Sequence, residues 1–169
     1  MRIRKRIRFK ALASKNLPKF MGKLRKAMRS PKKASDFKNP GRGVKSILKS
    51  IGCEKDFAGL YVLIKNGRPF YVGISRHVVA RLRQHLMGKR HTNATLAFQM
   101  ARKKWNGEGN RKQIEKRATF KKEFEKAKNT LAKCKVAFIE ISDPLTLYVF
   151  EVYAAVQLNT LEWNKFETH

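Results

Sequence analysis

The pattern over residues 59–74 limits the fold most narrowly, because it is typical of two short strands joined by a tight turn. Residues 59–64 (Gly-Leu-Tyr-Val-Leu-Ile) and residues 70–74 (Phe-Tyr-Val-Gly-Ile) are rich in β-branched and aromatic side chains. Asn66-Gly67 lies between them, and this dipeptide favours the left-handed backbone of a two-residue hairpin. The segment therefore predicts a β-hairpin, so a sheet must form part of the fold.

A helix is expected directly after the hairpin, from a cap at Ser75 to about Met87. Its apolar residues recur at helical spacing and define one buried face. That face is made of Val78, Val79, Leu82 and Leu86. Residues 94–104 and 111–133 predict two more helices, the second of them strongly charged with few core positions.

One more strand and one more helix are expected in the last third of the chain. Residues 135–141 have the alternating apolar composition of a strand. Asp143-Pro144 supplies the cap and the first-turn proline of a helix that reaches about Leu158. We therefore predict an α+β fold, with a small three-stranded antiparallel or mixed sheet flanked by helices.

The chain has a formal net charge of +28, from 40 Lys and Arg residues against 12 Asp and Glu residues. Such a field attracts polyanions, so nucleic acid is the expected partner. An anionic membrane would require an amphipathic helix with exposed large apolar residues. No apolar run approaches the roughly 18–20 residues of a membrane span. We expect no membrane contact and no small-molecule ligand.

The positive charge is concentrated in residues 1–50, which hold 18 Lys and Arg residues and one acidic residue, Asp36. We interpret this segment as a basic N-terminal extension, an arm followed by a flexible linker over residues 30–43. The arm is expected to contact nucleic-acid phosphates. Its first candidate cations are Arg2, Arg4, Lys5 and Arg6. An organelle transit peptide and a solvated tail are the alternatives.

Cys53 and Cys134 are the two cysteines, and they lack the spacing of metal ligands, so no zinc module is implied. Two thiols in a basic chain without a signal peptide are typical of a reducing cytosol. We therefore expect a cytoplasmic protein, associated with the nucleoid if the source is prokaryotic, with free thiols rather than a disulfide.

Glu151 is distinctive because it is the one ionisable acid or base other than tyrosine between Pro144 and Thr160. Its neighbours are apolar, so this helix is expected to pack largely inside. A buried carboxylate is costly unless a cation, a metal or several donors stabilise its charge. An ordinary ion pair with Arg or Lys and a divalent metal are both consistent with the pattern.

Arg81 and His85 are four residues apart on one expected helix, so they share a face. An arginine can bind phosphate and neutralise the charge that grows during phosphoryl transfer, and a histidine can move a proton. A solvated basic face is the alternative.

Tyr61 and Tyr71 lie on neighbouring expected strands. Such cross-strand pairs usually only pack against each other, although a phenol beside a metal can position water. Gly73 would allow a phosphate to approach the backbone closely.

Taken in order, these residues resemble the GIY-YIG nuclease superfamily. Gly59-Leu60-Tyr61 and Tyr71-Val72-Gly73 are similar to its two motifs, with Leu60 and Val72 in place of isoleucines. The resemblance covers about residues 58–169, so residues 105–133 would be a charged helical insertion in the nuclease domain. It implies a DNA endonuclease that hydrolyses phosphodiester bonds by in-line attack of water with one metal ion, Mg²⁺ or Mn²⁺, and leaves a 5′-phosphate.

The resemblance also implies a role for each motif residue. Tyr61 and Tyr71 would hold or activate the water and contact the scissile phosphate. Arg81 would stabilise the pentacovalent phosphate, and His85 would relay a proton. Glu151 would be the single metal-binding carboxylate.

Three further positions are carried over from the family. Asn164 would brace the site, and the spacing favours it over Asn159. His91 resembles a second histidine of some members. Some members also have a lysine directly after the second motif glycine. This chain has Ile74 at that position, so the nearby Arg76 is the candidate nucleic-acid contact. The alternatives are a non-catalytic basic nucleic-acid-binding module on the same scaffold and a ribosome-like RNA-binding protein.

Overall fold

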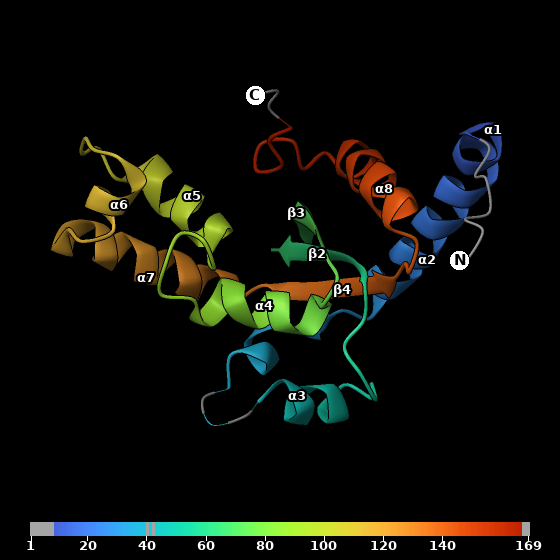
Figure 1. The fold of residues 1–169 in the computed structure, drawn as a ribbon, viewed down its shortest axis with the longest axis horizontal. Helices are drawn as coiled ribbons and strands as arrows, with labels where there is room; N and C mark the ends of the chain where they lie inside the picture. The colour runs from blue at the N-terminus through green and yellow to red at the C-terminus, as the bar shows by residue number, and fades with distance from the viewer. Residues whose placement is uncertain (1–8, 40, 42, 167–169) are drawn as a thin grey trace, which may run out of the picture.

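The computed structural model describes residues 9–166 except residues 40 and 42. Strands β2 (Gly59–Lys65) and β3 (Arg68–Ser75) form the predicted antiparallel hairpin. Asn66 and Gly67 occupy its turn with φ values of 51° and 77°, the left-handed conformation that this dipeptide favours. Strand β4 (Lys135–Glu140) pairs antiparallel with the other edge of β2. The predicted α+β fold is confirmed, with β2 between β3 and β4 in its sheet (Figure 1).

A fourth strand, β1 (Lys32–Lys33), extends the predicted sheet by two residues in the order β1-β4-β2-β3. It falls within residues 30–43, which were expected to be a flexible linker. In the structure β1 leads into a short 3₁₀ helix (Ala34–Phe37) whose Phe37 is fully buried. The Phe37 ring packs edge-on against Phe138 of β4, at 6.4 Å between centroids. This aromatic contact fixes the segment against the sheet.

Helix α4 (Val78–Met87) lies on the face of the sheet that carries Tyr61 and Leu63, and four further helices share its hydrophobic cluster (Figure 1). They are α3 (Val44–Ser50), α5 (Thr95–Lys104), α6 (Arg111–Ile114) and α7 (Ala118–Ala132). The buried face predicted for α4 is confirmed, since all four of its apolar residues are at most 3% exposed. Helices α5 to α7 form a lobe beside α4 that is continuous with this cluster (Figure 1). The expected insertion at 105–133 therefore contributes the loop after α5, together with α6 and α7.

Helices α2 (Leu17–Arg29) and α8 (Pro144–Gln157) cover the opposite face, which carries Leu60 and Val62. Helix α1 (Phe9–Ala11) continues through a π-helical turn (Leu12–Asn16) into α2. Described residues of the expected N-terminal arm thus belong to the core. Their buried side chains are Leu12, Leu17, Met21 and Leu24. The amphipathic pattern explains this, because α2 buries its apolar stripe and exposes its lysines and arginines.

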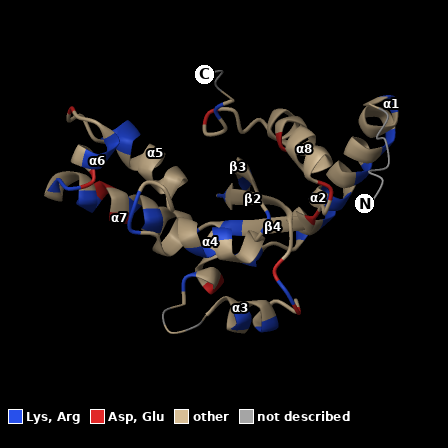
Figure 2. Cartoon of the chain, viewed as in Figure 1, with Lys and Arg blue, Asp and Glu red and all other residues tan. Residues whose placement is uncertain are grey.

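Candidate cations Arg2, Arg4, Lys5 and Arg6 lie outside the described residues. Among the residues that are described, basic side chains are distributed over α2, α4 and the α5–α7 lobe (Figure 2). Cys53 and Cys134 are free thiols. Within the described range, no helix has both the length and the apolar character needed to cross a membrane.

Helix α8 differs from the expectation that it packs largely inside. It buries one face, represented by Leu147 and Phe150, against the sheet and α2. Its outer face is apolar but exposed, through Leu145, Tyr148, Val152 and Val156. Glu151 lies between these two faces and is partly exposed.

Candidate active site

The hairpin places Tyr61 directly opposite Gly73 on the face that α4 covers. Tyr61 is 1% exposed, and its ring lies so close to Gly73 that any Cβ at residue 73 would collide with the phenol. The second motif glycine is therefore required to make room for the first motif tyrosine. This differs from the sequence interpretation, in which Gly73 makes room for a phosphate.

Tyr61, Tyr71 and His85 form a cluster of three rings. The Tyr61 hydroxyl lies 2.6 Å from Nε2 of His85, which α4 places in the core at 1% exposure. The ring centroids lie 6.3 Å apart for the two tyrosines, and His85 is 5.8 Å from Tyr61 and 6.0 Å from Tyr71. The structure thus brings together three residues that the sequence places on two strands and a helix.

Burial fixes the protonation state of this cluster. It lowers the pKa of His85 to about 3, with a further lowering from the charge of Arg81, so the imidazole is neutral at neutral pH. Burial raises the pKa of Tyr61 well above 10, so the phenol keeps its proton. The Tyr61 hydroxyl and the neutral imidazole therefore share one hydrogen bond, between the phenol oxygen and Nε2 of His85. The Nδ1 atom of His85 is buried and has no hydrogen-bond partner among the described residues.

Arg81 is held where helix α4 meets the start of α5. Its Nη1 donates to the carbonyl of Asn93 at 2.8 Å, and its Nη2 donates to the hydroxyl of Thr95 at 2.9 Å. Its positive charge lowers the pKa of Tyr61 and Tyr71, although burial of the two phenols has the larger, opposite effect. Arg81 is therefore a preorganised guanidinium beside the phenols. Thr95, which supports it, has no signal in the sequence.

Glu151 reaches the same site from α8, on the other side of the sheet. Burial is the main cause of the raised pKa of Tyr71, and the negative charge of Glu151 raises it further. Desolvation raises the pKa of Glu151 itself to about 7. Among the residues that the structure describes, Glu151 has no hydrogen bond or ion pair, so the ion-pair alternative does not apply.

The surroundings of Glu151 fit a divalent ion that is shared with a substrate. In the described ranges, no group of three or more His, Cys, Asp and Glu residues could enclose a metal. Mg²⁺ is commonly bound through one or two carboxylates, with water and substrate phosphate as its other ligands. A single desolvated carboxylate without a cationic partner, whose charge acts on the phenol of Tyr71, suits that arrangement.

Asn164 lies on the chain after α8 and contacts the hairpin from outside. Its Oδ1 accepts from the Val72 amide at 2.9 Å, and its Nδ2 donates to the Val72 carbonyl at 2.6 Å. Because β3 is an edge strand, these backbone groups would otherwise lack a partner in the sheet. Asn164 therefore braces the strand between Tyr71 and Gly73. Asn159 is instead exposed, with a φ of 53°, just after α8 ends.

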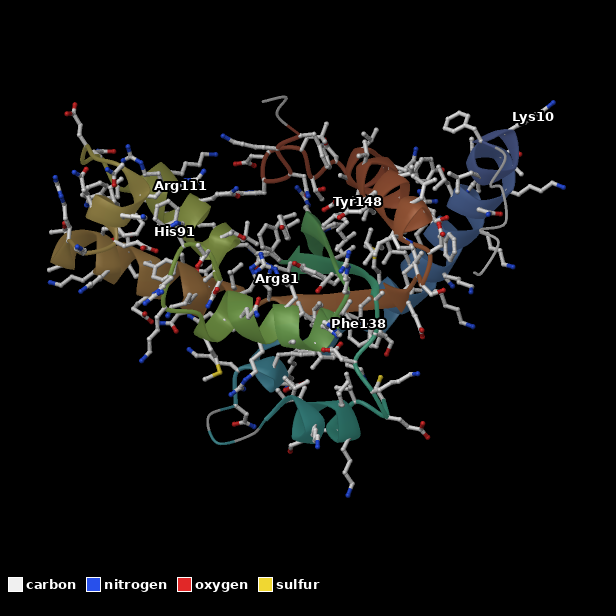
Figure 3. The ribbon with its side chains drawn as sticks, in the orientation of Figure 1. Lys10, Arg81, His91, Arg111, Phe138 and Tyr148 are labelled. Carbon is white, nitrogen blue, oxygen red and sulfur yellow. The ribbon has the colours of Figure 1, made fainter. Side chains whose placement is uncertain are left out.

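Two of the candidate residues lie away from the ring cluster. Nδ1 of His91 lies 2.7 Å from Oε1 of Glu115, and the His91 ring packs on Phe98 in the α5–α7 lobe. Figure 3 shows His91 in that lobe and Arg81 at the centre. Arg76 is exposed beyond β3 and lines a cavity of about 120 Å³ together with Tyr148.

Asp56 positions α4, a task that the sequence interpretation gave to Ser75. Its two carboxylate oxygens accept from the amides of Val79 and Ala80, each at 2.9 Å, and so cap the helix from outside. The Ser75 hydroxyl instead bonds to the backbone of His77, which precedes the helix. A capping residue normally directly precedes its helix, so no local pattern identifies Asp56.

Replacing Asp56 with alanine is expected to lower the free energy of unfolding by about 1–3 kcal/mol, because amide donors at the start of α4 lose their acceptors. Urea unfolding followed by circular dichroism measures the change. Asp36→Ala is the matched control, since Asp36 is exposed. It should change stability by less than about 0.5 kcal/mol. Equal effects of the two substitutions would contradict the capping role.

Comparison with known proteins adds one finding. Residues 57–155 match a family model described as the GIY-YIG catalytic domain, and this span is more than half of the chain. It contains both tyrosines of the ring cluster, together with Arg81, His85 and Glu151, and it ends before Asn164. No curated protein and no solved structure matches the chain.

Proposed function

The chain belongs to the GIY-YIG family, and on this premise we propose that it is a metal-dependent endonuclease that hydrolyses phosphodiester bonds in DNA. Membership in this family implies a nuclease and a nucleic-acid substrate. One observation carries the finer proposal. The partly buried Glu151 carboxylate has no cationic partner in the described part of the chain, yet its charge acts on Tyr71, whose ring packs on Tyr61 and is also affected by the charge of Arg81.

Glu151 is the proposed ligand of the metal, which we expect to be Mg²⁺ or Mn²⁺. A divalent ion bound there would act as a Lewis acid on the scissile phosphate and would lower the pKa of bound water. Arg81 would bind the same phosphate and neutralise the charge that develops during attack. Its bonds to Asn93 and Thr95 hold the guanidinium in place beforehand, so little reorganisation is needed.

Tyr61 and His85 form the proposed proton path. In the proposed path the Tyr61 hydroxyl donates to Nε2 of His85, 2.6 Å away, and its oxygen accepts a hydrogen bond from the attacking water. As the water oxygen bonds to phosphorus, a water proton passes to Tyr61 while the Tyr61 proton passes to Nε2 of His85. The bond from phosphorus to the 3′ oxygen breaks, and that oxygen takes the bonding pair and a proton from solvent. Tyr71 would contact the phosphate, and a 5′-phosphate remains.

Affinity for DNA would come from cations that surround this site. We propose that Arg76, at the end of β3, contacts the substrate next to the cleaved bond, and that basic residues of the N-terminal segment contact more distant phosphates. The first four of these are Arg2, Arg4, Lys5 and Arg6. His91 would not contact the scissile phosphate directly, because it binds Glu115 in the α5–α7 lobe.

Nicking of supercoiled plasmid tests the proposed function. The wild-type chain should convert supercoiled plasmid to the nicked form with Mg²⁺ or Mn²⁺ and should stop when EDTA removes the metal. DNA binding without nicking in either metal would instead favour the non-catalytic binding module. A higher affinity for RNA than for DNA at matched salt would favour the RNA-binding alternative.

The pH dependence of nicking should identify Glu151 as the titrating group. With its pKa raised to about 7, a substantial fraction of the carboxyl is protonated at neutral pH, and a metal must displace that proton. At low Mg²⁺ the rate should therefore fall as the pH drops through about 7, and higher Mg²⁺ should move this fall to lower pH. His85, with a pKa of about 3, should add no step in this range. A fall in the nicking rate near pH 6.5 that does not depend on the Mg²⁺ concentration and is absent in His85→Gln would contradict the assignment to Glu151.

A further inference from the structure

A groove outside the active site runs between helices α5 and α6 and the chain segment after α8. Its volume is about 930 Å³. Its lining includes Phe98, Arg102, Lys103, Arg111 and Trp163. The motif residues of the active site do not line it. Figure 3 shows Arg111 in the lobe that forms one wall.

Trp163 is shared by this groove and two neighbouring cavities of about 640 Å³ and 280 Å³. These cavities add further cations around the indole, namely Lys65, Arg68 and Lys104. The acidic lining residues are neutralised, since Glu162 pairs with Lys103 at 2.5 Å and Glu123 pairs with Lys126 at 2.6 Å. The space around Trp163 is therefore strongly positive.

The position of the Trp163 ring is fixed by the chain on both sides of it. Its amide donates to the Thr160 carbonyl at 3.1 Å, and the next residue, Asn164, is bonded to Val72 of β3. Lys103 lies 5.1 Å from the ring centroid. The other tryptophan, Trp105, is flanked by Arg102 and Arg117 and is covered by Gly107. Trp163 is thus the indole that a ligand in the groove can reach.

Both walls of the groove begin at the active site. Helix α5 starts at Thr95, which binds Arg81, and Arg102 follows seven residues later, about 10 Å along the helix axis. The other wall holds Trp163, whose neighbour Asn164 braces the strand between Tyr71 and Gly73. A nucleic-acid strand that leaves Arg81 would therefore enter the groove within a few nucleotides.

We propose that this groove binds a single-stranded segment of the DNA substrate, with Trp163 stacking on one of its bases. A positively charged groove with an aromatic platform is the arrangement that proteins use for single strands. Its volume is within the range of cavities that hold ligands of nucleotide size. The inference rests on the proposed nuclease function and names its preferred substrate, which is DNA with a single-stranded tail beside the cut rather than a blunt duplex.

Binding of tailed and blunt DNA without metal tests the proposal. Fluorescence anisotropy in EDTA compares a blunt duplex with the same duplex carrying a tail of about six nucleotides. The full chain should bind the tailed duplex about ten-fold more tightly, the gain from one stacked base and a few phosphate contacts. Trp163→Leu and the exposed Arg111→Glu should each remove most of this difference, while Trp163→Phe should keep part of it.

Lys49→Glu is the matched control for charge, because Lys49 is exposed on α3 at the opposite end of the molecule from the groove (Figure 1). It should weaken both DNAs equally. Equal binding of the two DNAs by the wild type would overturn the proposal, and so would an equal loss for both DNAs in Arg111→Glu. Arg111→Glu keeps the test valid if Trp163→Leu does not fold. This experiment measures binding and not cleavage, so its result is independent of the nuclease proposal. A chain without nuclease activity could still prefer the tailed DNA, and an active nuclease could still bind both DNAs equally.

Discussion

Replacing Glu151 with glutamine is expected to lower the rate of phosphodiester cleavage on the order of 10³-fold, the scale found when one electrostatic group is removed from an active site. Glutamine keeps the size of the side chain but removes the charge that would bind the metal. The carboxylate has no hydrogen bond or ion pair among the described residues, so the fold should not change. Single-turnover cleavage of an end-labelled duplex at saturating Mg²⁺ gives the rate.

Two comparisons make the Glu151 result specific. Glu140→Gln removes the same charge from an exposed position at the end of β4 and should cleave at the wild-type rate. DNA affinity of Glu151→Gln, measured without metal, should stay within a few-fold of the wild type. Cleavage by Glu151→Gln at the wild-type rate would show that the metal is bound elsewhere or is not needed.

Replacing Arg81 with lysine is expected to lower the cleavage rate on the order of 10²- to 10³-fold, although the positive charge is kept. A lysine ammonium lacks the planar fork of donors, so it cannot bind Asn93, Thr95 and a phosphate together. DNA affinity should change little, because the net charge is the same. The loss should therefore appear in the single-turnover rate rather than in Kd.

Arg83→Lys is the control for Arg81, since Arg83 lies on the same helix and donates to the Asn39 carbonyl, away from the rings. It should cleave at close to the wild-type rate. If Arg81→Lys and Arg83→Lys behave alike, Arg81 acts only through its charge, and its anchoring by Thr95 has no catalytic consequence.

The elements that the sequence predicts correctly are those with local signals. Asn66-Gly67 identifies the hairpin because few other dipeptides favour two consecutive left-handed residues, and Asp143-Pro144 identifies the start of α8. The Asp143 side chain indeed accepts from the Thr146 amide at 2.7 Å. The buried face of α4 follows in the same way from its apolar spacing.

Features that depend on distant residues could not be predicted from the sequence. Nothing near Phe37 indicates that it packs on Phe138, about 100 residues later, so its segment has the composition of a linker. The cap from Asp56 to Val79 and Ala80 spans a whole hairpin. The exposed apolar stripe of α8 was missed because composition shows how apolar a helix is, but not how much of it is covered.

The candidate site shows the same division. The order of Tyr61, Tyr71, Arg81 and Glu151 indicates a nuclease. The structure groups the two tyrosines with Arg81, and Glu151 acts on this group through Tyr71. Their mutual arrangement is new information, since sequence order does not show that Gly73 makes room for the Tyr61 ring. Only the resemblance indicates His91, and in the structure His91 contacts Glu115, a residue of the expected insertion.

Cleavage in ¹⁸O-labelled water is the most direct test of the central claim that this site adds water to a DNA phosphodiester. A duplex is digested by the wild type and by Glu151→Gln in parallel, and the mass of the cleaved ends is measured. We predict one ¹⁸O atom in the 5′-phosphate made by the wild type and almost no product from Glu151→Gln. Unlabelled ends, 3′-phosphate ends, or equal cleavage by the two proteins would contradict the account.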